Sequence, residues 1–289
     1  MGHGGSQPEG RASDRRLTDW FSAMSDWRSY DTIADAYERI WAARFEAVAR
    51  HLLEVAPPVE GSRLLDLGTG IGAVASALGG KARSLRTIVG CDLSLAMLSK
   101  ARHRVPDLRL LVAGIARLPF HDASFDLATA NCVLSHLAEY DRGLAEVVRV
   151  LARPGAFATA SWGPSSDPYA AAWKQLLEDA VGPDTAQRAA DTVVPSESYF
   201  SSPENVRTAL VEAGFTTARA ASAELAHDSS VDEYLADREL GASGRLGRQA
   251  LGDPGWRRFL GTARGEFVRR FGDRISYSRP VVLAVGTLG

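Results

Sequence analysis

A glycine-rich turn that follows an apolar stretch holds the residues best suited to chemistry. The turn contains Asp66, Gly68, Thr69, Gly70 and Gly72 within the run Asp-Leu-Gly-Thr-Gly-Ile-Gly. Glycine reaches positive φ without steric cost and lets a ligand approach the backbone. An alanine-rich segment follows, and a helix that begins there presents free N–H groups to the same ligand. The turn therefore predicts a binding site for a nucleotide-like molecule.

Two ligand classes fit this turn. The spacing from Gly68 to Gly70 to Ala73 matches the dinucleotide fingerprint, with alanine in the third place. Asp66 and Gly72 instead favour a ligand that carries a methionine group, because an acid suits an ammonium better than a pyrophosphate of like charge. We favour the second class, and we keep a nicotinamide-dependent oxidoreductase and a binding module without catalysis as alternatives.

Two more polar residues stand where later strands are expected to end. Asp92 follows a strand over 86–91, where its carboxylate can accept hydrogen bonds from both hydroxyls of a ribose. Its alternative role is to cap the next helix, a task that Ser94 can also perform. Asn131 lies at the carboxyl end of a strand over 125–132, where contacts to a bound cofactor gather, with structural capping as the alternative.

Short apolar runs separated by helical periods predict parallel strands with covering helices. Strands are expected at 62–67, 86–91, 108–113, 125–132 and 155–161, and helices at 71–79, 94–105 and 141–151. Later come a helix at 203–213, a strand at 215–224, a mostly helical insertion at 229–272 and a last strand at 280–287 that returns antiparallel. The predicted fold class is α/β, a Rossmann-like seven-stranded, mostly parallel sheet with helices on both faces.

The chain divides into four stretches. Residues 1–16 are polar and glycine-rich, which predicts a disordered tail. Aromatic and aliphatic residues at helical spacing predict an N-terminal helical cap over 17–60. The cofactor-binding core is expected at 61–165. Residues 166–289 are expected to add insertions on the substrate side together with the last two core strands.

Composition restricts the possible partners. The 33 basic and 35 acidic residues give a formal net charge of −2, so there is no overall basic field for nucleic acid. The arginine-rich stretch around Arg245 and Arg264 fits a solvated helix better than an RNA surface. The two cysteines have no metal-type spacing, and no apolar stretch approaches the roughly 20 residues of a membrane span. We expect a cytoplasmic monomer or homodimer that acts on a small molecule, with no nucleic acid, membrane or metal.

Two further blocks accompany the glycine turn and Asp92. They are Ala-Arg-Leu-Pro-Phe-His-Asp-Ala-Ser-Phe-Asp at 116–126 and Arg-Val-Leu-Ala-Arg-Pro-Gly-Ala at 149–156. In this order the blocks resemble the class I S-adenosylmethionine-dependent methyltransferases, in particular the small-molecule branch typified by ubiquinone and menaquinone biosynthesis enzymes. The resemblance covers about residues 30–162, and the segment from Tyr30 to Tyr37 is similar to a family segment that folds over the cofactor.

The resemblance implies S-adenosylmethionine as cofactor and methyl transfer to oxygen, carbon or nitrogen of a moderately hydrophobic secondary metabolite or quinone-like compound. One departure is Ile115, which stands where the family usually carries an acid that receives the adenine amino group. A methyltransferase-like fold that binds the cofactor but catalyses a cyclisation or pericyclic step is therefore the main alternative. The residues implied in cofactor binding are Tyr30, Asp66, Gly68, Thr69, Gly70, Gly72, Asp92, Leu93, Met97, Ile115, Ala116 and Asn131.

His136 and Tyr37 are the candidates for catalysis. His136 follows the fourth strand, where the family's active site opens, and imidazole titrates near neutrality. The alternative is a packing histidine. Tyr37 is a candidate base or substrate anchor in the N-terminal segment. Because displacement at a sulfonium mainly requires alignment of donor and acceptor, a base is not needed for every acceptor.

Overall fold

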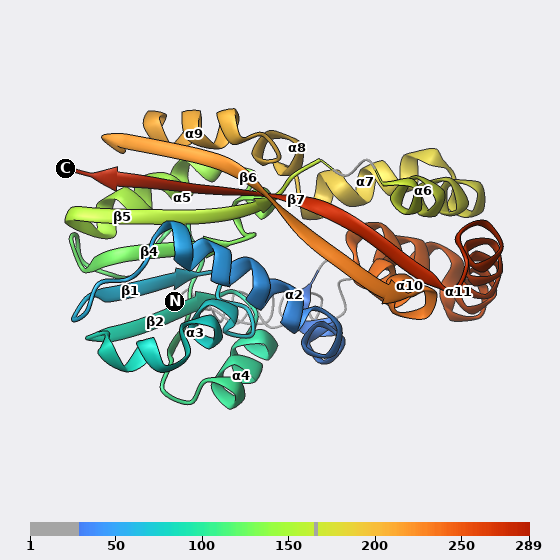
Figure 1. Ribbon diagram of the computed structural model, residues 1–289, viewed down its shortest axis with the longest axis horizontal. Helices are drawn as coiled ribbons and strands as arrows, with labels where there is room; N and C mark the ends of the chain where they lie inside the picture. Colours follow the sequence, from blue (N-terminus) through green and yellow to red (C-terminus); the bar gives the residue numbers. More distant parts are fainter. Residues whose placement is uncertain (1–28, 165–166) are drawn as a thin grey trace, which may run out of the picture.

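The computed structural model of the protein describes residues 29–164 and 167–289. One seven-stranded sheet has the strand order β3-β2-β1-β4-β5-β7-β6, and helices cover both of its faces (Figure 1). The first five strands run parallel, and β7 pairs antiparallel with both β5 and β6. This confirms the predicted fold class and the antiparallel return of the last strand.

The elements follow the expected alternation through the first half of the chain. The strands are β1 (Arg63–Leu67), β2 (Thr87–Asp92), β3 (Arg109–Val112), β4 (Phe125–Asn131), β5 (Leu151–Trp162), β6 (Thr217–Ser230) and β7 (Arg274–Leu288). The α-helices are α2 (Ala34–Val55), α3 (Ala73–Leu78), α4 (Leu95–Arg104), α5 (Tyr140–Val150), α6 (Pro168–Val181), α7 (Pro183–Val193), α8 (Glu197–Phe200), α9 (Pro203–Glu212), α10 (Val231–Leu240) and α11 (Ala242–Phe271). Short 3-10 turns are η1 (Tyr30–Thr32), η2 (Gly79–Ser84) and η3 (Leu134–His136).

Alternation along the strands divides the core into two layers. Leu64 and Leu65 are both fully buried, but on opposite faces of β1. Leu64 packs with Val48 and Leu52 of α2, whereas Leu65 packs on the face that is covered by α5, α8 and α9. The helix α2 is thus a covering helix of the sheet along its C-terminal half. The predicted tail at 1–16 and the start of the predicted cap lie outside the described residues.

The sheet reverses its order between β1 and β4, which are neighbours although two strands separate them in sequence. The helices that follow β1 and β4 lie on opposite faces, so a crevice opens at the carboxyl ends of these strands. Open α/β sheets bind their ligands at such a switch point. The glycine turn after β1 and Asn131 at the end of β4 are both brought to this crevice.

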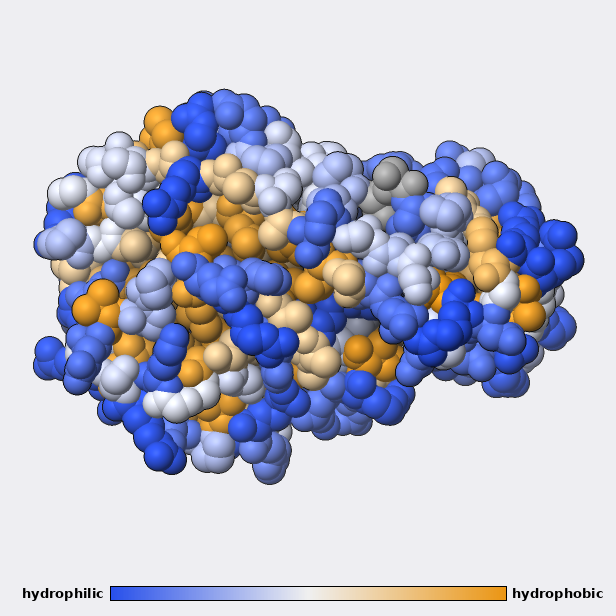
Figure 2. Space-filling model, in the orientation of Figure 1, coloured by the Kyte–Doolittle hydropathy of each residue, from blue (hydrophilic) through white to orange (hydrophobic). Residues whose placement is uncertain are grey.

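A second body, the helical lobe, is formed by α6, α7, α10 and α11 at one end of the molecule (Figure 1). Its core contains Trp173, Tyr234, Trp256 and Phe267, all at most 4% exposed. Figure 2 shows a waist between this lobe and the larger body that holds the sheet. The lobe draws on two insertions, since α6 and α7 precede β6 whereas α10 and α11 lie between β6 and β7.

The last two strands are much longer than predicted. The pairing of β6 with β7 runs without a break from Thr217 opposite Thr287 to Ser230 opposite Arg274. The apolar pattern marked only the portions within the sheet, at 215–224 and 280–287. The extensions at 225–230 and 274–279 intersperse polar residues with single apolar ones, and Ile275 and Tyr277 of β7 pack in the core of the helical lobe. This β6–β7 ribbon joins the sheet to the helical lobe.

No helix in the described part of the chain is both long enough and apolar enough to cross a membrane. Within the same residues, histidine, cysteine, aspartate and glutamate side chains form no group of three or more that can hold a metal ion.

Candidate active site

The glycine turn has a backbone that side chains would not tolerate. Gly68 and Gly70 have φ angles of 58° and 54°, in the left-handed region. A Cβ atom at Gly68 would also lie 2.7 Å from a methyl carbon of Val133. The turn therefore needs glycine at Gly68 both for its conformation and for its close approach to the segment after β4.

Asp66 lies beneath the turn rather than in the large cavity beside it. Its carboxylate is 1% exposed and accepts hydrogen bonds from the hydroxyls of Thr69 (2.6 Å) and Thr129 (2.8 Å). Burial raises the pKa of Asp66 to about 6, although both hydroxyl bonds oppose the shift. Asp66 and Thr69 line only a small pocket of about 20 Å³ under the turn. Their position indicates a role in shaping the turn.

Asp92 faces the large cavity with its carboxylate already oriented. One oxygen accepts from the backbone N–H of Gly70 and the other from that of Ser94, each at 2.9 Å. Burial raises the pKa of Asp92, and three backbone N–H groups lower it. The cap of α4 is the Ser94 hydroxyl, which accepts from the N–H of Met97. Capping is thus performed by Ser94, and Asp92 keeps lone pairs for a ligand.

The large cavity, here the cofactor cavity, has a volume of about 470 Å³ and lies at the switch point of the sheet. Eight of the twelve predicted cofactor residues line it, namely Tyr30, Gly68, Gly70, Asp92, Leu93, Met97, Ile115 and Asn131. It also includes residues that sequence reasoning missed, among them Phe45, Cys132, Val133 and Leu137. These are apolar residues after β4 or on α2, and no polar signal marked them.

Two of the predicted cofactor residues lie outside both pockets. Gly72 has a φ of 83° and begins α3, but its Cα faces Ala101, Val105 and Leu108 behind the turn. Ala116 is exposed, and it does not line the cofactor cavity. Gly72 and Ala116 therefore line neither pocket, and their part in cofactor binding stays a prediction.

One end of the cofactor cavity is apolar. Ile115 is 6% exposed and lines this end together with Leu93 and Met97. Leu93 is 74% exposed, and its side chain lies beside Gly114 on the same cavity wall. A flat heterocycle can lie between Leu93 and Ile115 without an acidic side chain there.

Asn131 lines the cofactor cavity and has a side-chain acceptor without a partner in the described structure. Its Nδ2 donates to the backbone carbonyl of Phe45 at 3.0 Å, which fixes the orientation of the amide. Its Oδ1 is buried and has no hydrogen-bond partner within the described structure. A buried carbonyl oxygen without a donor is costly, so this atom suits a ligand that carries N–H groups.

The N-terminal segment closes one side of the cofactor cavity. Asp31 accepts hydrogen bonds from the Ser94 hydroxyl (2.6 Å) and from the N–H of Ala96 (3.0 Å), which ties η1 to the start of α4. Tyr30 and Tyr37 then line the cavity, with their rings edge to face 6.0 Å apart. Burial raises the pKa of Tyr30 to about 12 and that of Tyr37 further above its usual value. Neither phenol is therefore suited to act as a base near neutrality.

His136 lies between the cofactor cavity and a second cavity. Its Nδ1 is 2.9 Å from the carbonyl oxygen of Val193. Because a carbonyl only accepts, Nδ1 carries the proton, and Nε2 of the neutral ring keeps a lone pair. Burial lowers the pKa of His136, which keeps the ring neutral at physiological pH. His136 is thus a neutral imidazole with a fixed tautomer.

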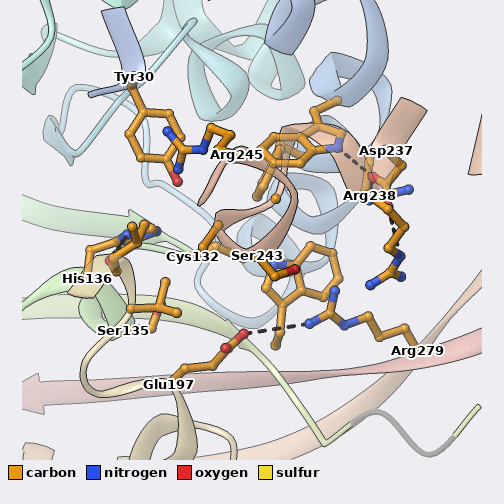
Figure 3. A pocket seen from close by; sticks show the side chains of 18 residues that line it. Tyr30, Cys132, Ser135, His136, Glu197, Asp237, Arg238, Ser243, Arg245 and Arg279 are labelled. Atoms are coloured by element: carbon orange, nitrogen blue, oxygen red, sulfur yellow. Dashed lines mark hydrogen bonds and ion pairs between the residues drawn. The ribbon is translucent and has the colours of Figure 1, made fainter. Parts of the chain in front are cut away.

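The second cavity, here the acceptor cavity, has a volume of about 280 Å³ and lies where the sheet meets the helical lobe (Figure 3). Tyr30, Phe45, Cys132 and His136 line both cavities. Four arginines belong to the acceptor cavity, and sequence reasoning did not assemble them because they come from distant elements: Arg44 on α2, Arg238 on α10, Arg245 on α11 and Arg279 on β7.

Three tryptophans in the second half of the chain have different positions. Trp162 lines the acceptor cavity, and Arg279 stacks over its ring at 4.4 Å. Trp173 and Trp256 pack together in the core of the helical lobe instead. Of the arginine-rich stretch, Arg245 reaches the cavity, whereas Arg264 is exposed and pairs with Asp232.

Comparison with known proteins agrees with this geometry. A family model described as a methyltransferase domain matches residues 65–159. A malonyl-[acyl-carrier protein] O-methyltransferase of Geobacter sulfurreducens is 31% identical over 87% of this chain and 92% of its own length. The chain is a class I S-adenosylmethionine-dependent methyltransferase. This membership confirms the family that the sequence blocks predicted. It also confirms S-adenosylmethionine as the cofactor.

Two further relatives show how far the similarity extends. A demethylmenaquinone methyltransferase of Beutenbergia cavernae is 32% identical over 46% of this methyltransferase and 54% of the relative, so the match spans about half of that protein. The structure of a Haemonchus contortus phosphoethanolamine N-methyltransferase 2 in complex with S-adenosyl-L-methionine has a TM-score of 0.51. It covers 97% of this chain and 61% of its own at 17% identity, which shows a shared fold.

Proposed function

We propose that this methyltransferase transfers a methyl group from S-adenosylmethionine in the cofactor cavity to a small molecule in the acceptor cavity. The observation that carries the proposal is the junction of the two cavities at Tyr30, Phe45, Cys132 and His136. Two ligands in these cavities meet there, shielded from water on several sides. Alignment of this kind is the main requirement for an in-line displacement.

The residues of the cofactor cavity fit the three parts of the cofactor. Asp92 has lone pairs for the ribose hydroxyls, and the unpartnered Oδ1 of Asn131 suits the α-ammonium of the methionine part. Ile115 and Leu93 offer apolar contacts to the adenine. When bound, S-adenosylmethionine supplies a methyl group on a sulfonium that is already activated for displacement.

We assign His136 as the group that removes the acceptor's proton. Its Nε2 lone pair is available because Nδ1–H donates to Val193. A hydroxyl, an amine or an acidic C–H that attacks the methyl group must lose a proton, and Nε2 can accept it as the new bond forms. Tyr37 is assigned to the wall of the cofactor cavity and not to proton transfer, since burial raises the pKa of its phenol.

The acceptor is proposed to be a flat compound, either a secondary metabolite or a quinone-like molecule, methylated on oxygen, carbon or nitrogen. Tyr30, Trp41, Phe45 and Trp162 provide aromatic surface in a cavity of about 280 Å³. The demethylmenaquinone methyltransferases among the relatives agree with such an acceptor. We further propose that the enzyme acts in the cytoplasm as a monomer or homodimer, without a nucleic-acid partner.

The test has two stages. Calorimetry with S-adenosylmethionine, S-adenosylhomocysteine and NADH measures which ligand the protein binds, and binding of NADH alone would exclude a methyltransferase. Incubation with methyl-labelled S-adenosylmethionine and a panel of menadiol, caffeate and naphthol then follows the label into product. A changed acceptor that carries no label would favour the cyclisation alternative.

A further inference from the structure

The acceptor cavity carries an excess of positive charge. Arg44, Arg238 and Arg279 share two carboxylates there, Glu197 and Asp237, while burial keeps His136 neutral; the fourth arginine, Arg245, has an interaction partner of its own. Tyr30, Trp41, Phe45 and Trp162 supply most of the remaining large side chains. Buried charges are normally paired, so an uncompensated excess in a cavity indicates an anionic ligand.

Asp237 is already engaged by neighbours. The carboxylate is 6% exposed, and one oxygen accepts from both Arg44 and the indole N–H of Trp41. The other oxygen is 3.7 Å from Nε of Arg238, beyond a hydrogen bond. Asp237 therefore compensates Arg44 and leaves Arg238 without a hydrogen-bonded acid.

Arg238 and Arg279 are held in place but are not satisfied. Arg238 stacks over the ring of Tyr234 at 4.7 Å, and Arg279 stacks over Trp162 at 4.4 Å. Stacking leaves the N–H groups at the edge of a guanidinium free to donate. The Nε atoms of both arginines are buried and have no hydrogen-bond partner among the described residues. The nearest acid to Arg279 is Glu197, at 3.8 Å.

The two ends of the acceptor cavity have different chemistry. His136 and Tyr30 lie on one side in Figure 3, next to the cofactor cavity, whereas Arg238 and Arg279 lie on the opposite side. The arginines come from α10 and β7. Burial and the nearby Arg238 lower the pKa of Arg279, whereas Tyr234 and Asp237 raise the pKa of Arg238 against the effect of burial, so the charge of Arg279 is the one that is disfavoured. An anion at this end would relieve the repulsion.

We propose that Arg238 and Arg279 form a subsite for an anionic oxygen group of the acceptor, a carboxylate or a phosphate monoester, remote from the methylated atom. The inference rests on the proposed function and deepens it. The acceptor is an amphipathic acid whose flat body lies between the aromatic walls, with its nucleophilic atom beside His136. The anionic group fixes the orientation of the acceptor, and it is not the group that is methylated.

Calorimetry on protein saturated with S-adenosylhomocysteine tests the subsite with two matched pairs of probes. Caffeate is compared with caffeamide, and naphthyl phosphate with naphthol, so that only the anionic group differs within a pair. At least one acid should bind about tenfold or more tightly than its neutral partner, because charge-assisted hydrogen bonds to two guanidinium groups are lost in the neutral compound. The pair with the larger preference identifies carboxylate or phosphate.

Variants locate the preference. Arg279→Met and Arg238→Met should each bring acid and neutral probe close to equal affinity, while Arg279→Lys retains the charge and should keep an intermediate preference. Arg264→Met, on the exposed surface of α11, is the matched control and should behave as wild type. Without probe, Arg279→Met should melt at or above the wild-type temperature, because it removes a guanidinium whose charge is disfavoured by burial and by Arg238.

Three outcomes would overturn the subsite: equal affinity for acid and neutral probe in both pairs, no binding of either acid, or a strong fall in melting temperature in Arg279→Met. The affinity for S-adenosylhomocysteine distinguishes a failure of the subsite from a failure of the proposed function. If the protein fails to bind S-adenosylhomocysteine, the proposed function fails. If it binds the cofactor product but shows no preference for acids, only the subsite fails.

Discussion

The cofactor cavity at the edge of the sheet and the acceptor cavity beside the helical lobe are built from different kinds of groups. In the sheet body, the polar residues of the cofactor cavity come from the ends of neighbouring strands, and backbone N–H groups hold Asp92 in place. In the acceptor cavity, long side chains from distant elements meet, and aromatic rings stack against Arg238 and Arg279. Under the proposed function, cofactor binding depends on backbone conformation, whereas acceptor binding depends on side chains that can change without disturbing the turn.

The largest effect is expected at the junction of the two regions. His136→Asn keeps an N–H donor for the carbonyl of Val193 but removes the Nε2 lone pair. Transfer of label to whichever panel compound accepts it should fall about 10² to 10⁴-fold, the usual contribution of a general base. Affinity for S-adenosylhomocysteine should stay as in wild type, and the exposed His121→Asn is the control. Unchanged turnover would show that His136 only packs against α7.

The next effect belongs to the sheet body alone. Asp92→Ala removes the carboxylate that faces the cofactor cavity, and we expect about 100-fold weaker binding of S-adenosylhomocysteine from the loss of charge-assisted hydrogen bonds. Calorimetry measures the affinity, and Asp107→Ala on the exposed surface is the control. Probe binding in the acceptor cavity should persist at high cofactor concentration. Wild-type affinity in Asp92→Ala would contradict the assignment to the ribose.

Glycine replacements should have opposite signs in the two regions. Gly68→Ala forces a Cβ into the left-handed region and against Val133, which should lower the free energy of unfolding by about 1–3 kcal/mol and weaken cofactor binding. Gly261→Ala on α11 meets no atom within 4 Å and should raise the free energy of unfolding by up to about 1 kcal/mol. Urea unfolding measures both values. A tolerated Gly68→Ala would show that the turn is less constrained than described.

The smallest effect concerns pH. Burial and neighbouring arginines lower the pKa of His227, on the β6–β7 ribbon, from 6.5 to about 4. Its neutral form stabilises the fold above pH 6.5, and this contribution is lost as the pH falls toward about 4. His227→Phe keeps the ring contact with Tyr277. Between pH 6.5 and about 4, its free energy of unfolding, measured with urea, should fall by about 1–2 kcal/mol less than that of the wild type.

The contribution of Asp66 to the free energy of unfolding should change with pH in the opposite direction to that of His227. The pKa of Asp66 is raised to about 6, so its contribution to the free energy of unfolding is present below the usual carboxyl pKa and is lost as the pH rises through about 6.

The control for His227→Phe is a substitution of an exposed histidine. His103→Phe should show the same dependence of the free energy of unfolding on pH as the wild type. An identical pH dependence in His227→Phe and wild type would remove the distinction between the ribbon and the sheet body.

Local signals explain which parts the sequence predicted. In the first half of the chain, strands, turns and helices follow one another within a few residues. The glycine turn, Asp92 and Asn131 therefore indicated the position of the cofactor cavity from sequence alone. Asp66 was expected in that cavity, but its position under the turn depends on Thr129 of β4, which no local pattern connects to it. The arginine cluster had no local signal either, since Arg44 and Arg279 are separated by most of the chain.

The uninterrupted ladder of the β6–β7 ribbon restricts how this protein can evolve. Side chains alternate between its two faces, so a single inserted residue between Arg279 and Thr287 would turn Arg279 away from the acceptor cavity. Insertions in the helices beyond the ribbon carry no such penalty. Sequence drift is therefore expected to gather in α6, α7 and α11, while the length of the ribbon stays constant, and descendants with new acceptors can arise by exchange of helices at a fixed spacing from the methyl donor.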